Sequence, residues 1–112
     1  MEKANQNEYS QPANTYVFSQ DEIKSKIIPV LKSYNVSKAA LFGSYARNEQ
    51  TPSSDVDIIV DFPTNVGLAF FSLLEDLKSC LGLSVDLEYY PDLENESRDF
   101  FEKIKKDEVV IL

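Results

Sequence analysis

Two adjacent residues, Gly43 and Ser44, come directly after a short apolar run and have the types that phosphate sites use. A glycine lets the backbone approach a ligand closely, because it has no side chain in the way. Backbone amides that open a short helical turn after the glycine can then receive phosphate oxygens. The pair therefore indicates a place where a phosphorylated ligand could rest.

Ten residues later, Asp55 and Asp57 form an Asp-x-Asp pair at the start of a second apolar segment. Side chains two residues apart on a strand point to the same side, so both carboxylates can face one place. Carboxylates that close raise each other's pKa unless a cation lies between them, and Mg²⁺ prefers oxygen ligands together with water and substrate phosphate. The pair predicts a divalent-metal site, and Asp86 supplies a third carboxylate if its strand lies alongside.

Each of these groups also has a plain structural interpretation. Gly43 can make a turn that the next residue caps, and Asp55 can simply end a loop. Asp57 and Asp86 can be solvated positions on a sheet, and Glu88 shares a face with Asp86. The combination is more specific, because Gly-Ser and Asp-x-Asp at this fixed spacing occur by chance on the order of once in a thousand such chains.

The amino-acid composition excludes several kinds of functional site. The 112 residues include 11 Lys and Arg against 19 Asp and Glu, a net charge of −8, and no histidine. Without histidine, a Cys/His zinc site and a histidine base are excluded, so a metal site must be built of oxygen ligands. The single cysteine excludes an internal disulfide, and the shortage of clustered cations argues against general nucleic-acid binding.

The sequence predicts one cytoplasmic domain preceded by a flexible tail. No apolar run approaches the roughly 18 residues that cross a bilayer, and residues 1–14 lack the apolar core of a signal peptide. Residues 1–18 are polar and are predicted to form a flexible tail, whereas residues 19–112 form the folded domain. We therefore expect no membrane partner.

Regular elements that would position the site can be predicted from periodicity. Ser19 and Glu22 have the spacing of a capping box that begins a helix, which Pro29 is expected to kink. Further helices are predicted over residues 67–81 and 95–106, and strands over residues 38–42, 55–62, 84–89 and 109–112. This order predicts an α/β or α+β domain in which helices cover one sheet.

Two helices are expected to bury one apolar face each. The first face consists of Leu68, Phe71, Leu74, Leu77 and Leu81, with Gly82 as a left-handed cap. The second consists of Phe100, Phe101 and Ile104.

Three blocks of the sequence resemble the nucleotidyltransferase superfamily typified by DNA polymerase beta, and specifically its minimal single-domain members. The blocks are residues 41–47 (LFGSYAR), 54–60 (SDVDIIV) and 85–87 (VDL), and the likeness in element order extends from about residue 19 to residue 112. The resemblance implies the nucleotidyltransferase fold, a mixed four-stranded sheet with helices packed against it. Asn48 departs from the glycine that such proteins often have, although asparagine also tolerates left-handed conformations.

The resemblance also implies a role for each matching residue. The implied nucleotide-binding residues are Gly43, Ser44 and Arg47, with Arg47 placed to grip phosphate oxygens. The implied catalytic residues, which would also hold two Mg²⁺ ions, are Asp55, Asp57 and Asp86. Such ions offset charge and align the attacking and leaving oxygens, so in-line transfer needs no histidine.

Three functions are compatible with this resemblance. The first is Mg²⁺-dependent transfer of AMP from ATP to a tyrosine of a HEPN-type partner toxin, with this chain as the antitoxin. The second is transfer to a small molecule such as an aminoglycoside, with a homodimer completing the acceptor pocket. The third is a non-catalytic module that neutralises a partner by contact, which the three mutually repelling carboxylates disfavour.

Overall fold

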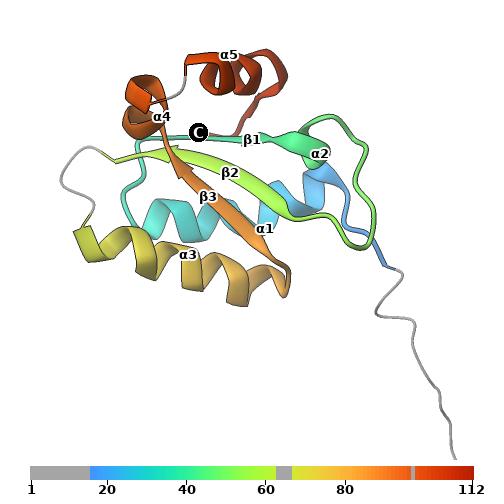
Figure 1. The fold of residues 1–112 in the computed structure, drawn as a ribbon. Coiled ribbons are helices and arrows are strands. Elements are labelled where there is room, and N and C mark those ends of the chain that lie inside the picture. The colour runs from blue at the N-terminus through green and yellow to red at the C-terminus, as the bar shows by residue number, and fades with distance from the viewer. Residues whose placement is uncertain (1–15, 63–66, 97) are drawn as a thin grey trace, which may run out of the picture.

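The computed structural model describes residues 16–62, 67–96 and 98–112. Within them, nine elements follow one another along the chain (Figure 1). In order they are α1 (Gln20–Ser33), β1 (Lys38–Phe42), α2 (Gly43–Ala46), β2 (Val56–Asp61), α3 (Gly67–Leu81), β3 (Val85–Tyr89), α4 (Tyr90–Glu96), α5 (Arg98–Asp107) and β4 (Val109–Val110). The predicted tail over residues 1–18 lies mostly outside the described residues, and Phe18, at its end, packs against the core.

The strands form one mixed four-stranded sheet, as the resemblance implies, and their order in the sheet is β3-β2-β1-β4. The strand β1 runs antiparallel to β2 and to β4, whereas β2 and β3 run parallel. Two parallel neighbouring strands need a crossover connection, and α3 lies in the connection between β2 and β3. This topology brings the starts of β2 and β3 side by side, which decides where their first side chains meet.

Helices cover both faces of the sheet (Figure 1). On one face, α1 and α3 contribute Ile23, Ile27, Leu73 and Leu77 to the larger core cluster. On the other face, α4 and α5 pack on the sheet through a smaller cluster, with Ile104 buried in it. Each central strand alternates between the two clusters, since every second side chain points to the same face.

The first helix begins where the sequence predicts. The side chain of Ser19 accepts a hydrogen bond from the Glu22 amide, and the Glu22 carboxylate accepts one from the Ser19 amide, which completes the capping box. The helix runs through Pro29 without a break in its 14 residues. Pro29 is exposed, so the carbonyl group that loses its amide partner lies on the solvent side.

Two predictions about helix faces are wrong in part. Leu68 is 84% exposed and Phe71 is 64% exposed, and the buried positions of α3 are Leu73, Leu77 and Leu81. Gly82 does adopt the predicted left-handed conformation, with φ of +67°. Nearly every residue in the first two turns of α3 is apolar, so spacing alone cannot select the stripe that meets the core.

The last predicted helix, over residues 95–106, corresponds to α5, whereas α4 before it is not predicted. The helix α4 starts directly after β3, with Pro91 in its first turn, where a missing amide removes no helical bond. In α5, Ile104 is buried as predicted, but Phe100 is 40% exposed. Among residues 16–62, 67–96 and 98–112, no helix has the length and apolar character needed to span a bilayer.

Candidate active site

A close approach between the start of α2 and the strand β2 forms the centre of the site. Phe42, the last residue of β1, lies directly opposite Asp57 of β2 in the antiparallel register. Gly43 follows with φ of +70°, and a Cβ atom there would overlap Oδ2 of Asp57 and lie 3.0 Å from its Cγ. Only glycine therefore allows α2 to sit against this carboxylate.

The parallel pairing of β2 with β3 brings a second carboxylate to the same place. Asp57 and Asp86 are register partners, so both side chains stand next to each other on the face that α4 and α5 cover further along. Glu88 lies two residues beyond Asp86 on that same face, while Leu87 points into the core on the other side. Three carboxylates thus share one face at the start of the parallel pair.

Burial and mutual repulsion raise the pKa of two of these groups. The pKa of Asp57 is raised to about 6, first by burial and then by the charges of Asp86 and Asp55, while Arg47 opposes the rise. The pKa of Glu88 is raised to about 7, first by burial and then by the charge of Asp86. Bound cations would relieve this repulsion, so the face is electrostatically suited to them.

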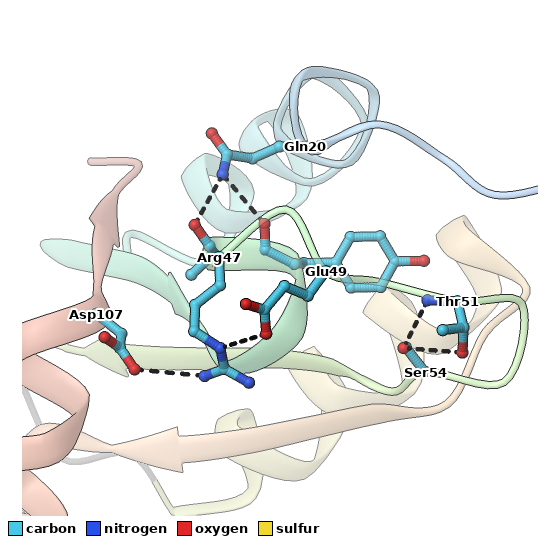
Figure 2. A network of polar contacts seen from close by, with 8 residues as sticks. Gln20, Arg47, Glu49, Thr51, Ser54 and Asp107 are labelled. Atoms are coloured by element: carbon cyan, nitrogen blue, oxygen red, sulfur yellow. Dashed lines mark hydrogen bonds and ion pairs between the residues drawn. The ribbon is translucent and has the colours of Figure 1, made fainter.

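Arg47 lies at the end of α2 and is held by two carboxylates (Figure 2). Its Nε donates to Oε1 of Glu49 at 3.0 Å, and its Nη1 donates to Oδ2 of Asp107 at 3.3 Å. Asp107 is the last residue of α5, so this ion pair ties the turn after β1 to the C-terminal helix. The guanidinium is partly exposed and its charge acts on Asp57, which places a cation beside the carboxylate face.

A side chain from the first helix fixes the other side of α2. Nε2 of Gln20 donates to the carbonyl oxygens of Tyr45 at 3.1 Å and Ala46 at 3.3 Å (Figure 2). Without these bonds, the last carbonyl groups of a four-residue helix would have few partners. Gln20 therefore holds the turn that carries Gly43 and Arg47 in a fixed position.

The loop between α2 and β2 is also built from local polar contacts. Asn48 has φ of +58°, so this asparagine takes the left-handed conformation for which glycine is usual. The Thr51 amide donates to Oγ of Ser54 at 2.9 Å (Figure 2). The Ser54 amide in turn donates to the Thr51 carbonyl at 3.0 Å. This tight turn places Asp55 directly before the start of β2.

A glycine turn against paired carboxylates is thus present at one edge of a mixed sheet, and comparison with known proteins shows the family to which the chain belongs. The sequence matches the nucleotidyltransferase domain family over residues 24–112, most of its length. The chain belongs to this family. The mixed sheet with its helices is accordingly the fold of a nucleotidyltransferase.

Three known proteins illustrate the similarity of this nucleotidyltransferase to others. A candidate protein adenylyltransferase of Methanocaldococcus jannaschii is 46% identical over 71 residues, which are 62% of this chain and 76% of the relative. A chain of a toxin–antitoxin complex with AMP-PNP superposes with a TM-score of 0.67 at 26% identity, covering 80% of this chain and 72% of that one. A chain of the complex between tri-AMPylated Shewanella oneidensis HEPN toxin and MNT antitoxin has a TM-score of 0.62 at 25% identity, covering 83% and 71%.

The structure of this nucleotidyltransferase brings three of the six predicted site residues together. Gly43, Asp57 and Asp86 meet where β1 ends and where β2 and β3 begin. Asp55 lies just before β2 with an exposed side chain, and it takes part through its charge, which raises the pKa of Asp57.

The other two predicted residues, Ser44 and Arg47, lie in and after α2. The Ser44 carbonyl oxygen accepts a hydrogen bond from the Glu49 amide at 2.9 Å, which closes the turn around Arg47. The guanidinium of Arg47 is directed to its two carboxylate partners rather than to the paired aspartates. Contact of Ser44 or Arg47 with phosphate therefore stays a prediction.

Sequence reasoning did not assign a role to Glu88, Gln20 or Asp107. The alternation of side chains along β3 would have sufficed to include Glu88, because residues two apart on a strand share a face and Glu88 must therefore lie on the face of Asp86. No local pattern marks Gln20 or Asp107, since their contacts with α2 span 25 to 60 residues of sequence.

The residues at this edge fit a divalent ion that substrate helps to hold. Within the part of the chain that the structure describes, no group of three or more His, Cys, Asp or Glu side chains is arranged to hold an ion alone. Mg²⁺ in phosphate-transfer sites usually takes one or two carboxylates and completes its shell with water and substrate phosphate. Asp57 and Asp86 supply such a pair, and the repulsion between them favours a cation.

Proposed function

We propose that this nucleotidyltransferase is a Mg²⁺-dependent protein adenylyltransferase that moves AMP from ATP to a tyrosine hydroxyl of a HEPN-type helical partner. In this proposal the chain acts as the antitoxin of a toxin–antitoxin pair. The support comes from the relative named for protein adenylyl transfer and from the similar folds in toxin–antitoxin complexes, one with AMP-PNP and one with an AMPylated toxin.

The observation that carries the catalytic part is the contact of Gly43 with Asp57 beside Asp86. A structural domain gains nothing from a half-buried carboxylate whose pKa is raised by neighbouring acids. It also gains nothing from a backbone turn so close to that carboxylate that only glycine fits. Both features are useful if a triphosphate and its cations bind across the sheet edge at which the turn and the acids lie side by side.

Each residue then has a defined task. The backbone at Gly43 and Ser44 contacts the triphosphate, and the planar guanidinium of Arg47 grips two of its oxygens. Asp55, Asp57 and Asp86 hold the divalent ions, which would supply charge compensation and alignment of the reacting oxygens. The acids and the turn therefore bind one polyphosphate from neighbouring positions at the sheet edge.

The transfer itself is an in-line substitution at the α-phosphorus. The tyrosine oxygen forms the new bond to the α-phosphorus, and the bond from that phosphorus to the oxygen bridging to the β-phosphorus breaks. Pyrophosphate leaves with the electron pair, and the hydroxyl proton passes to Asp86 and then to solvent. The products are the AMP-tyrosine phosphodiester and pyrophosphate, so atoms and charge balance.

A partner protein is a reasonable source of the acceptor because the side chains of Asp55 and Asp86 are exposed. A helical partner can present a tyrosine to the open carboxylate face. The small-molecule alternative remains an outcome that the following experiment distinguishes.

The test is transfer of label from ATP carrying ³²P at the α-phosphate, with Mg²⁺, in an extract of the source cell. Wild-type chain is compared with Asp57→Asn and with Asp21→Asn, a control on α1 whose carboxylate is 92% exposed. We expect a labelled protein band with the wild type and Asp21→Asn but none with Asp57→Asn, and mass spectrometry then locates AMP on a tyrosine. Label on a small molecule would support an aminoglycoside-type acceptor, and equal labelling by Asp57→Asn would refute the site.

A further inference from the structure

A pocket of about 150 Å³ lies next to the carboxylate face, between the end of β1 and the helix α5. Residues from β1, the α2 turn and α5 form its walls, including Phe42, Gly43, Arg47, Phe100, Lys103 and Asp107. The pocket belongs to the side of the sheet on which α4 and α5 lie (Figure 1). None of the roles in adenylyl transfer given above uses its α5 wall.

The pocket and the carboxylates form one continuous site. Phe42, at the pocket, is the register partner of Asp57, so the two side chains stand side by side on one face of the sheet. Gly43 belongs to both, because it lines the pocket and also rests against Asp57. A ligand whose phosphates lie at Gly43 can therefore reach the pocket with its next chemical group.

An aromatic ring forms part of the pocket wall. Phe100 projects from the first half of α5 and is 40% exposed, so part of its ring is accessible at the pocket. It meets Phe42 edge to face, with ring centroids 6.4 Å apart and an angle of 85° between the rings. This contact orients the Phe100 ring, so a planar ligand would find a positioned apolar surface.

Two cations stand at the same pocket. Arg47 is fixed by Asp107 at 3.3 Å, whereas Lys103 has no ion-pair partner among residues 16–62, 67–96 and 98–112. In a chain of net charge −8, a pocket lysine that forms no ion pair with the described residues is available to an anionic or electron-rich ligand. The pocket therefore combines an apolar ring with donors, as sites for heteroaromatic groups do.

The size of the pocket limits what it can hold. Pockets that enclose drug-sized ligands measure about 300 to 1,000 Å³, so a volume of about 150 Å³ accommodates one part of a nucleotide only. With the triphosphate at Gly43, that part is the nucleoside end, and the apolar ring suits its base rather than its ribose.

We propose that this α5 pocket is the nucleobase subsite, in which Phe100 packs against the base and Lys103 donates to its edge. The proposal rests on the function proposed above, because it takes the triphosphate to lie at Gly43. It adds a recognition role for α5, a helix outside the three sequence blocks that resemble the superfamily.

The absence of tryptophan in this chain allows a direct test. A Phe100→Trp variant carries a single tryptophan at the pocket, and its fluorescence reports contact with a stacked base. With Mg²⁺ present, we expect ATP to quench this fluorescence, while inorganic tripolyphosphate, which has no base, binds without comparable quenching. A Phe71→Trp variant, at an aromatic position on α3 that is 64% exposed, serves as the control and should respond to neither.

Affinity measurements on alanine variants test the same subsite without a reporter. Phe100→Ala should weaken ATP binding by roughly 5- to 30-fold, the lower part of what stacking on an aromatic side chain supplies. The same variant should bind tripolyphosphate as the wild type does, and Phe71→Ala should change neither affinity. Because Phe100 is 40% exposed, a thermal melt is expected to show the variant folded.

The outcomes separate this proposal from the proposed function. If Phe100→Ala lost affinity for ATP and tripolyphosphate equally, α5 would contact the phosphates and not the base, and the proposed base subsite would be refuted. Unchanged ATP affinity in Phe100→Ala, or a wild type that binds tripolyphosphate as tightly as ATP, would overturn it as well. Failure of the wild type to label any protein, with the ATP results as expected, would instead refute protein adenylyl transfer and leave the subsite standing.

Discussion

Gly43 and Gly82, which share nearly the same left-handed conformation, offer a matched pair for measuring the contact at the centre of the site. Gly43 has φ of +70° and Gly82 has φ of +67°, so alanine brings nearly the same backbone strain to both. A Cβ atom at residue 82 would meet nothing within 4 Å, whereas at residue 43 it would overlap Oδ2 of Asp57. The difference between the two variants therefore isolates the contact with the carboxylate.

The strain itself is modest. A non-glycine residue in the left-handed region costs about 1–2 kcal/mol, which lowers the Tm of a domain of this size by about 5–15 °C. We expect Gly82→Ala to lose this much stability in urea or thermal unfolding. Gly43→Ala should lose at least as much, because rotation of the Asp57 carboxylate relieves Oδ2 but leaves the strand-bound Cβ of Asp57 3.3 Å away.

Activity should separate the two variants clearly. In Gly43→Ala the Asp57 carboxylate must turn away from the new Cβ atom, and misplacement of a reacting group by about 1 Å costs on the order of 100-fold in rate. We expect Gly82→Ala to transfer AMP at nearly the wild-type rate and Gly43→Ala to be slower by about 100-fold, measured below both unfolding transitions. Similar rates for the two variants would refute the view that the close approach of Gly43 to Asp57 organises the site.

Three further predictions concern the groups around this contact. The raised pKa of Asp57 means that the folded state resists ionisation, so the stability of the metal-free chain should rise as pH falls from 7 through about 6 toward 4. In urea titrations, Asp57→Asn should remove most of this pH dependence of stability and leave only the part that comes from the raised pKa of Glu88. A steep pH dependence that persists in Asp57→Asn would contradict the assignment to Asp57. Asp107→Asn removes one of the two anions on Arg47 and should tighten ATP binding by roughly two- to fivefold in calorimetry, while Arg47→Ala weakens it. Gln20→Ala removes two hydrogen bonds to α2 and should lower stability by about 1–2 kcal/mol and raise the KM for ATP, and an unchanged KM would show that the turn holds without it.

Local sequence signals predicted the elements of this fold well where the physics is local. The capping box at Ser19 and Glu22 depends on residues three apart, and the structure contains it. The left-handed cap at Gly82 and the bounds of α3 follow in the same way from the end of an apolar periodic segment. The buried stripe of α3 does not, because Leu68 and Leu73 are equally apolar and only the position of α1 and the sheet decides which is covered.

The sequence names a set of candidate site residues but does not give their geometry. Asp57 and Asp86 could be paired in advance only by assuming that their strands are neighbours, and the parallel register of β2 and β3 decides that they meet. The contact between Gly43 and Asp57 depends likewise on the antiparallel register of β1 with β2. The ion pair of Arg47 with Asp107 spans 60 residues and leaves no periodic trace in the sequence.

The energetic character of the site explains why its residues stand out from the rest of the chain. Asp57 is half-buried among acids that raise its pKa, and Gly43 occupies a left-handed turn pressed against it, so two unfavourable features share one sheet edge. Folding alone would favour their removal, since an uncharged amide at residue 57 ends the repulsion. A cation-bound polyphosphate reverses that preference, because it needs both the acids and the uncovered backbone. The most stable variants of this domain should therefore be the ones that have lost nucleotide transfer.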